Sequence, residues 1–298
     1  MAEARYTLLT ERGVLAVSGP DRRAFLQGLV SNDVGKVSAD QARYAALLTA
    51  QGRYLHDFMM VEQDETLLLE GERARLADLR RRLSVYRLRA KVALDERADL
   101  AVAAAFGSGA LARLQLRPEP GVVRRFGEGV AFVDPRLAAL GARLLLPRAT
   151  AGATLELAGF TPAEFEAYDL LRLELGVADG SRDLVPEKTL LLEAGFDELN
   201  GVDWNKGCYI GQELTARTKY RGLIKRRLLP VAVIGPSPAP GTPIYADGLE
   251  VGEMRSGRDG HGLALLRLDQ LREPRRLTAG NALIVPSRPA WMRSNARD

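Results

Sequence analysis

The sequence predicts an α+β protein with a separate all-β unit at its carboxyl end, and three observations lead to this prediction. The chain has 298 residues, about twice the roughly 150 residues of an average domain. Its first third alternates strand-like runs with helical periodicity. From residue 228 onward it changes to short apolar runs between loops rich in Pro and Gly. We therefore expect an α+β body over residues 1–227 and a small all-β domain over residues 228–298.

Residues 42–94 are expected to form one sheet layer with a helix packed on it. Strand-like runs at 42–49 and 53–61 flank a turn of composition Ala-Gln-Gly, which predicts a hairpin. After a third strand, leucines recur on one face of a helix over 72–84, and residues 86–94 again have the composition of a strand. This order of hairpin, helix and strand is that of a ferredoxin-like layer.

The clearest single element follows a middle segment, 98–158, in which several short strands are supported only by weak alternation. Thr161 is a suitable N-cap, Pro162 suits the first helical position, and Glu164 completes a capping box. An apolar stripe then continues as far as Gly176, a typical residue at the end of a helix. The spacing predicts a helix between Thr161 and Gly176.

The composition excludes several classes of protein. Forty-two Lys and Arg residues against 38 Asp and Glu residues give a net charge of +4, which favours local arginine groups over a polybasic coat. One cysteine, Cys208, and two histidines exclude a disulfide framework and make a metal site within one chain unexpected. No apolar stretch reaches the roughly 18 residues of a membrane span, and the amino terminus lacks a signal core. We expect a cytoplasmic protein with no membrane partner.

Cys208 lies in the segment whose residue types most strongly indicate a chemical role. It follows Lys206 by two residues and stands between Gly207 and Gly211. A nearby cation favours the thiolate form of cysteine, and glycines let other groups approach the backbone closely. These features indicate a reactive or ligating sulfur. The alternative is a buried cysteine that serves as a small hydrophobic residue, and the sequence leaves both interpretations open.

Residues 206–213, with the sequence KGCYIGQE, resemble the signature of the YgfZ family over its whole length. This family comprises folate-binding proteins of iron–sulfur cluster assembly and repair that are related to the glycine-cleavage T-protein, an aminomethyltransferase. The resemblance continues in order through most of the chain, in FLQGLVSND (25–33), QGRYLHD (51–57), LELG (173–176), PE (186–187) and RGLIKRR (221–227). It implies a T-protein-like folate-binding body of two lobes, followed by a small β-barrel.

The resemblance also implies which residues form the sites. In the signature, Cys208 is the functional thiol with Lys206 beside it, and the other motif residues are Gly207, Tyr209, Gly211, Gln212 and Glu213. Tetrahydrofolate or a derivative is the implied cofactor, and no stable metal is expected. The residues expected to bind the folate are Asp57, Glu174, Tyr86 and Arg226.

Each expected folate residue has a chemical reason and a simpler alternative. Asp57 occupies the position of the T-protein's catalytic aspartate, and Glu174 that of its pterin-contacting glutamate. A carboxylate suits the N–H edge of a pterin, Tyr86 offers a ring for stacking, and Arg226 offers a partner for glutamyl carboxylates. Alternatively, a neighbour such as Arg53 or a backbone N–H satisfies Asp57, and Glu174 is solvated or paired with a basic side chain such as Lys188.

The leading hypothesis is a tetrahydrofolate-binding accessory protein in the assembly or repair of iron–sulfur clusters. Its expected partners are folate and, transiently, iron–sulfur assembly proteins or client enzymes. Because a single thiol cannot hold a cluster, Cys208 would serve as a transient ligand, as a reacting thiol or as half of a two-protein site.

Two alternatives remain open. The first is a folate-dependent one-carbon (aminomethyl) transferase of T-protein type that uses Asp57 and Glu174. In the hairpin, however, Gly52-Arg53 and His56-Asp57 replace the Gly-Gly and paired acids of the T-protein. The second is an RNA-binding or tRNA-modification factor that binds nucleic acid through two basic groups. These groups are Arg73, Arg75, Arg80, Arg81, Arg82, Arg87, Arg89 and Lys91, and Arg221, Lys225, Arg226 and Arg227.

Overall fold

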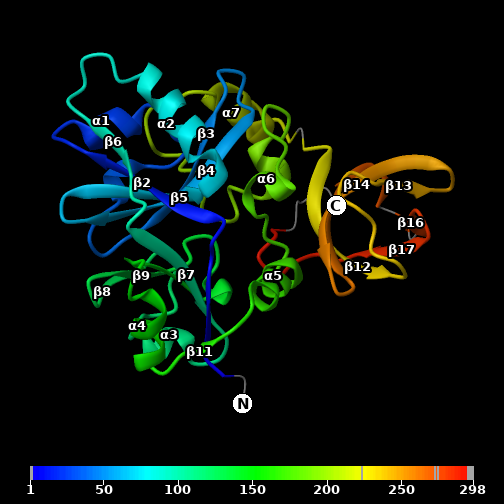
Figure 1. Cartoon of the computed structure of the whole chain (residues 1–298). Coiled ribbons are helices and arrows are strands. Elements are labelled where there is room, and N and C mark those ends of the chain that lie inside the picture. Colours follow the sequence, from blue (N-terminus) through cyan, green and yellow to red (C-terminus); the bar gives the residue numbers. More distant parts are fainter. Residues whose placement is uncertain (1–2, 223, 272, 274, 294–298) are drawn as a thin grey trace.

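Two open β-sheets and a closed barrel make up the fold (Figure 1). The computed structural model describes residues 3–222, 224–271, 273 and 275–293. Helices pack on the sheets and lie between the sheets and the barrel, so the α+β class and the carboxyl-terminal barrel are confirmed. Across the described residues, no helix is both long and apolar enough to cross a membrane.

The first sheet has five antiparallel strands in the order β3-β4-β5-β2-β6. Its elements are β2 (Arg12–Ser18), α1 (Arg22–Gln27), β3 (Arg43–Leu48), β4 (Tyr54–Gln63), β5 (Thr66–Glu72), α2 (Leu76–Val85) and β6 (Ala93–Glu96), with 3₁₀ turns at Val34–Lys36 and Arg73–Arg75. Helix α2 buries Leu76, Leu79 and Leu83 against this sheet. The predicted hairpin and the helix with its leucine face are therefore confirmed.

The strand predicted over residues 86–94 is wrong. Strand β6 begins only at Ala93, and the residues before it form a loop. Short-range hydrogen bonds close this loop, from the amide of Arg87 to the carbonyl of Ser84 and from the amide of Ala90 to the carbonyl of Arg87. The side chains of residues 84–89 are exposed, so the apparent alternation has no core to face. Strand β2, which precedes residues 42–94, completes the layer instead.

The second sheet has six strands in the order β11-β1-β7-β10-β9-β8. Its elements are β1 (Arg5–Leu8), β7 (Leu100–Phe106), α3 (Ala110–Arg113), β8 (Val123–Phe126), β9 (Gly129–Val133), β10 (Ala142–Pro147), α4 (Ala151–Leu157) and β11 (Thr161–Pro162), with a 3₁₀ turn at Ala138–Leu140. On β7, Val102 and Ala104 face the core shared with the first sheet, whereas Ala101 and Ala103 face the core under α3 and α4. A strand covered on both faces shows no polar alternation, which explains the weak strand signal of this segment.

Helix α5 (Phe165–Glu174) begins later than the capping box predicts. Thr161 and Pro162 form β11, which pairs in parallel with β1. The amides of Thr161 and Ala163 donate to the carbonyls of Ala4 and Tyr6, and these long-range bonds replace the local cap. The capping box is therefore wrong, whereas the helix itself and its end before Gly176 are confirmed.

The carboxyl-terminal barrel closes six strands in the order β12-β15-β14-β13-β16-β17. They are β12 (Arg226–Ile234), β13 (Pro243–Ala246), β14 (Leu249–Arg258), β15 (His261–Arg267), β16 (Leu277–Ala279) and β17 (Ala282–Pro286), with a 3₁₀ turn at Leu268–Gln270. Their inward side chains form a core of their own. The chain between α5 and the barrel contains α6 (Gly180–Asp183), a 3₁₀ turn at Leu191–Ala194 and α7 (Gln212–Tyr220).

Buried polar contacts join α5 and α6 to the barrel. Arg172 on α5 forms an ion pair with Asp183 of α6, and its Nη2 donates to the hydroxyl of Ser256 on β14 at 2.7 Å. Asp183 also accepts hydrogen bonds from the amide of Ser256 at 3.0 Å and from its hydroxyl at 2.5 Å. All three side chains are buried. Since buried charges are costly without partners, these contacts fix the position of the barrel on the body.

Replacement of Arg172 by Met is expected to lower the free energy of unfolding by about 3 to 5 kcal/mol, because Asp183 would remain as a buried carboxylate without its cation. Urea denaturation followed by circular dichroism measures the loss. Arg124→Met, at an exposed arginine of β8, is the control and should change the free energy by about 0.5 kcal/mol or less. A loss for Arg172→Met as small as that of the control would contradict this role.

Candidate functional site

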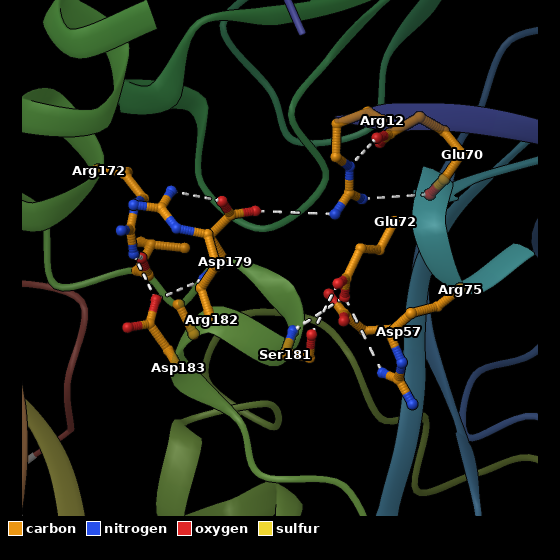
Figure 2. Close-up of polar contacts among 12 residues, drawn as sticks. Arg12, Asp57, Glu70, Glu72, Arg75, Arg172, Asp179, Ser181, Arg182 and Asp183 are labelled. Carbon is orange, nitrogen blue, oxygen red and sulfur yellow. Dashed lines mark hydrogen bonds and ion pairs between the residues drawn. The ribbon is translucent and has the colours of Figure 1, made fainter. Parts of the chain in front are cut away.

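A chain of ion pairs, most of whose side chains are buried, crosses the centre of the molecule (Figure 2). Arg12 on β2 pairs with Glu70 on β5, and its Nη1 lies 3.7 Å from Oδ1 of Asp179, just before α6. From α6, Arg182 bridges Asp179 at 2.9 Å and Asp169 of α5 at 3.0 Å. We call this chain the central ion-pair network, and its members are Glu70, Arg12, Asp179, Arg182, Asp169, Arg172 and Asp183.

The network stabilises the charged forms of Arg12, Asp179 and Asp169. Burial by itself would lower the pKa of Arg12, but the negative charges of Glu70 and Asp179 outweigh burial and raise it. Burial would raise the pKa of Asp179, yet three neighbouring arginines hold it well below its usual range. The same balance lowers the pKa of Asp169 to about 2. At neutral pH the centre of the protein is therefore a set of paired charges.

A cavity of about 200 Å³ lies beside this network, and we call it the central cavity. Leu9, Phe165 and Tyr168 give it apolar walls, two of them aromatic. Apart from Thr10, its polar lining is made of charged residues of both signs, which are Glu11, Arg12, Arg136, Arg143, Asp169, Arg172, Asp179 and Arg182. Apolar walls, two of them aromatic, together with charged donors and acceptors suit a planar ring with polar edges.

Arg143 on β10 lines this cavity and has a side-chain donor without a partner. The residue is only 3% exposed, and its Nη2 donates to the hydroxyl of Tyr168 at 2.9 Å. Its Nε lies 3.5 Å from Oδ2 of Asp134, and its Nη1 has no hydrogen-bond partner among the residues that the structure describes. A buried N–H without an acceptor costs free energy, which a ligand or a water with an oxygen there would recover. Arg143 is therefore a candidate ligand-binding residue.

Asp57 on β4 lies next to the network, but its carboxylate is already engaged. The hydroxyl of Tyr44 donates to Oδ2 at 2.9 Å, and the hydroxyl of Tyr54 donates to Oδ1 at 2.7 Å. Burial and the charge of Asp57 raise the pKa of both tyrosines well above the usual range, so both stay protonated and able to donate. Two tyrosine hydroxyls thus satisfy this buried carboxylate, whereas Arg53, the donor expected in the simpler alternative, donates to the carbonyl of Lys188.

Glu174 lies away from the central cavity. It is exposed at the end of α5 and lines a second cavity of about 350 Å³ together with Arg5 and Phe106. Its carboxylate oxygen lies 3.9 Å from Nε2 of His261 on β15. No contact in the described part of the chain joins Glu174 to Asp57, so the structure does not bring the two expected folate carboxylates together.

Tyr86 and Arg226 also lie outside the central cavity. Tyr86 is exposed directly after α2. Arg226 begins β12, where its Nε donates to Oε1 of Glu193 at 3.2 Å. A folate role for Glu174, Tyr86 and Arg226 therefore stays a prediction.

Cys208 is exposed, in a loop of residues 203–211 that we call the Cys208 loop. Exposure rules out the interpretation of Cys208 as a buried hydrophobic residue. The ammonium of Lys206 points into the body, where it donates to the carbonyls of Gln27 at 2.8 Å, Val30 at 2.6 Å and Asn32 at 2.8 Å. Burial lowers the pKa of Lys206 to about 8. Lys206 therefore anchors the loop to the end of α1.

Gly211 fixes the other end of the Cys208 loop. Its φ of +80° lies in the left-handed region, and a Cβ there would stand 2.5 Å from the carbonyl oxygen of Thr49 and 2.9 Å from Cα of Gly52. The turn between β3 and β4 thus packs directly on the start of α7. Gly207, in contrast, has no heavy atom within 4 Å of the place of a Cβ.

The remaining motif residues support the loop or extend its surface. Tyr209 is buried, and its amide donates to Oε1 of Gln212 at 3.3 Å. Glu213 is exposed and pairs with Arg217 along α7 at 2.7 Å. Gln212 and Glu213 therefore lie in the first turn of α7, while Tyr209 belongs to the core.

An aromatic and cationic surface flanks the Cys208 loop. Nζ of Lys219 lies 3.9 Å from the ring centroid of Trp204, and Tyr220 meets the same ring edge-on at 6.3 Å. In the described residues, no group of three or more His, Cys, Asp or Glu side chains is placed to hold a metal ion. Cys208 is therefore a single exposed sulfur on a fixed loop.

Arg143 and Arg172 were not expected from the sequence, although a signal for both exists. Arg143 is the one charged residue in the apolar strand β10, and Arg172 follows Tyr168 by one helical turn on the buried side of α5. A charged side chain at a buried position must be paired or bound to a ligand. The signal for both arginines is therefore a charged residue at a position where the pattern of the strand or helix predicts an apolar one. No sequence motif marks them.

Replacement of Gly211 by Ala is expected to lower the free energy of unfolding by at least about 2 kcal/mol, because the methyl group meets the backbone of the β3–β4 turn. Gly207→Ala is the matched control in the same loop and should change it by about 0.5 kcal/mol or less. Chemical denaturation of both variants gives the comparison, and equal losses would show that the turn does not confine Gly211.

Comparison with known structures defines the fold. The chain is similar to the crystal structure of the glycine cleavage system aminomethyltransferase T from Bartonella henselae, with a TM-score of 0.78. The match covers 95% of this chain and 84% of that chain at 18% sequence identity. The body and barrel therefore have a T-protein-like fold, as the sequence resemblance implies.

Comparison with known sequences defines the family. Residues 225–294 match the model "CAF17, C-terminal beta-barrel domain". The mitochondrial iron–sulfur cluster assembly factor IBA57 of Homo sapiens is 34% identical over 310 residues, which cover 95% of this chain and 84% of the human protein. The IBA57 homologue of Neurospora crassa is 34% identical over 263 residues, 82% of this chain and 57% of that protein. The chain therefore belongs to the IBA57/CAF17 (YgfZ) family of iron–sulfur cluster assembly factors.

Proposed function

We propose that this protein assists the assembly or repair of iron–sulfur clusters through Cys208 and binds a tetrahydrofolate in the central cavity. The names of its relatives support the first part, since the human and Neurospora proteins are iron–sulfur cluster assembly factors. Its partners would be assembly proteins or client enzymes that dock transiently. The expected cytoplasmic compartment stays a prediction, because those relatives are mitochondrial by name.

The exposed thiol on a fixed loop is the observation that carries the proposal. Lys206 and Gly211 hold the Cys208 loop at both ends, so the sulfur of Cys208 is presented at a defined position. Iron–sulfur clusters are held by several thiolates, and Cys208 supplies one. The sulfur would therefore complete a site whose other ligands belong to a partner, or would take up a transferred group for a short time.

The central cavity supports the folate part. A pterin is a flat bicyclic ring with a carbonyl acceptor and N–H donors on its edges, which suits aromatic walls, the free Nη1 of Arg143 and nearby carboxylates. The volume of about 200 Å³ admits the ring system, with the rest of the molecule outside. When bound, tetrahydrofolate supplies a carrier for one-carbon units. The residues of this chain hold and orient it.

Neither alternative function gains a specific observation. For the transferase, both oxygens of Asp57 already accept hydrogen bonds from tyrosines. For RNA binding, Arg81 and Arg82 in the centre of the basic group on α2 pair with Asp78. The accessory function is therefore the one we carry forward.

Tetrahydrofolate is expected to bind the purified protein clearly more tightly than about 1 mM, as measured by isothermal titration calorimetry. Arg143→Met should weaken binding at least about tenfold, equivalent to about 1.4 kcal/mol, because the free donor is lost. Phe165→Ala, which removes an aromatic wall, should act in the same direction. Arg124→Met is the control, and thermal unfolding confirms that each variant is folded. Binding by the native protein that is no tighter than millimolar would contradict the folate proposal. Unchanged binding by both cavity variants would show that folate binds outside the central cavity.

A strain that carries Cys208→Ala in place of the native protein is expected to lose activity of its iron–sulfur enzymes, while the amount of those enzymes stays constant. Aconitase activity before and after reconstitution with iron and sulfide separates lost clusters from lost protein. Asn205→Ala, at an exposed neighbour in the same loop, is the control and should behave as the native protein does. Full enzyme activity in the Cys208→Ala strain would show that the thiol is not required for the proposed function.

A further inference from the structure

The loop between α2 and β6 carries an unusual concentration of exposed apolar side chains. Of the ten large apolar residues exposed in the described part of the chain, three fall within four positions. They are Val85 at 66% exposure, Tyr86 at 45% and Leu88 at 90%. Figure 1 shows this loop projecting from the first sheet on the side of the molecule opposite the barrel. We call residues 80–91 the basic loop region, for the charges described next.

Unpaired cations surround these apolar side chains. Arg80, Arg87, Arg89 and Lys91 are all exposed, and their side chains make no hydrogen bond or ion pair with any residue that the structure describes. The nearest acidic group on α2, Asp78, is taken up by other arginines. Asp21 accepts a hydrogen bond from the backbone amide of Lys91 at 2.7 Å. The region therefore presents a positive field around an apolar tip.

The local backbone keeps the apolar residues outside. Helix α2 turns Leu76, Leu79 and Leu83 inward, so Val85 at its end falls off the buried stripe. Leu88 has a φ of +42°, in the left-handed region that leucine rarely adopts. No packing contact accounts for this strained conformation, since the Leu88 side chain is almost fully exposed. The folded body alone gives no reason for an apolar tip here.

We propose that the basic loop region is a peripheral contact for an anionic lipid bilayer. Val85, Tyr86 and Leu88 would enter the headgroup boundary, and the four free cations would meet lipid phosphates. Arginine and lysine suit this arrangement because their long stems lie along apolar surface while their charges stay in water. The sequence expectation of no membrane partner considered only an apolar span, which a peripheral contact does not need.

Shape and chemistry favour a bilayer over a macromolecular partner. Val85 and Leu88 project into solvent, at 66% and 90% exposure, and they line neither of the two cavities described above. Tyr86 offers a ring on which an RNA base could stack, but Val85 and Leu88, the two more exposed side chains of the tip, are aliphatic and offer none. The inference is independent of Cys208 and of the central cavity.

Co-sedimentation with vesicles tests the proposal. The protein is expected to bind vesicles of phosphatidylcholine with roughly one quarter phosphatidylglycerol, and to bind pure phosphatidylcholine at least about tenfold more weakly. Binding to the anionic vesicles should fall as salt is raised, because exposed charges are screened. The paired substitution Val85→Ser with Leu88→Ser should lower the partition coefficient at least about tenfold. Arg87→Gln with Arg89→Gln should lower it as well and reduce the salt dependence.

Leu157→Ser is the matched control, since Leu157 is also 90% exposed but lies on α4 of the second sheet. It should leave the partition coefficient unchanged. No preference for anionic vesicles, or an equal loss in the Leu157 variant, would overturn the proposal. Salt-dependent binding to a single-stranded RNA that survives the apolar substitutions, without vesicle binding, would overturn it in favour of nucleic acid.

Discussion

The buried guanidinium of Arg172 is the constraint on which the arrangement of the units depends. It reaches Asp169 on its own helix, Asp183 on α6 and Ser256 in the barrel. Because none of these charges has access to water, each must keep its partner, and the helices cannot shift relative to the barrel without leaving a charge unpaired. The network then continues through Arg182 and Asp179 to Arg12, so the first sheet is bound to the same point.

The second sheet is attached to this centre by arginines of its own. Arg143 donates to the hydroxyl of Tyr168, and Arg136 donates to the carbonyl of Ala178 at 3.0 Å. The central cavity is lined by residues from both sheets and from α5 and α6, so it exists only when all of them are docked. The hairpin of β3 and β4 connects this centre to the Cys208 loop, because Asp57 lies on β4 and Gly52 of the turn packs against Gly211. The β3–β4 hairpin therefore links the region of the central cavity to the loop that carries the Cys208 thiol.

Local pattern explains what could be predicted from the sequence, and long-range contact explains what could not. The hairpin and α2 follow from turn composition and from leucines at helical spacing, signals that lie within a few residues. The predicted start of α5 was wrong because the amide of Thr161 donates a hydrogen bond to the carbonyl of Ala4, a long-range contact that no local rule detects. Cys208, in contrast, could be identified from the sequence because it lies in a contiguous motif. The cavity residues Arg143 and Arg172 come from separate segments that only the folded sheets bring together.

The anchoring of Lys206 bears on how the chain is made. Its acceptors lie between Gln27 and Asn32, 174 to 179 residues earlier in the chain. A ribosome adds roughly 5 to 20 residues each second, so these carbonyls are synthesised about nine to thirty-six seconds before their donor. The amino-terminal segment therefore leaves the ribosome before its partners exist, as strand β1 also does before β11. The thiol acquires its fixed position only at the end of this process, after most of the protein has been synthesised.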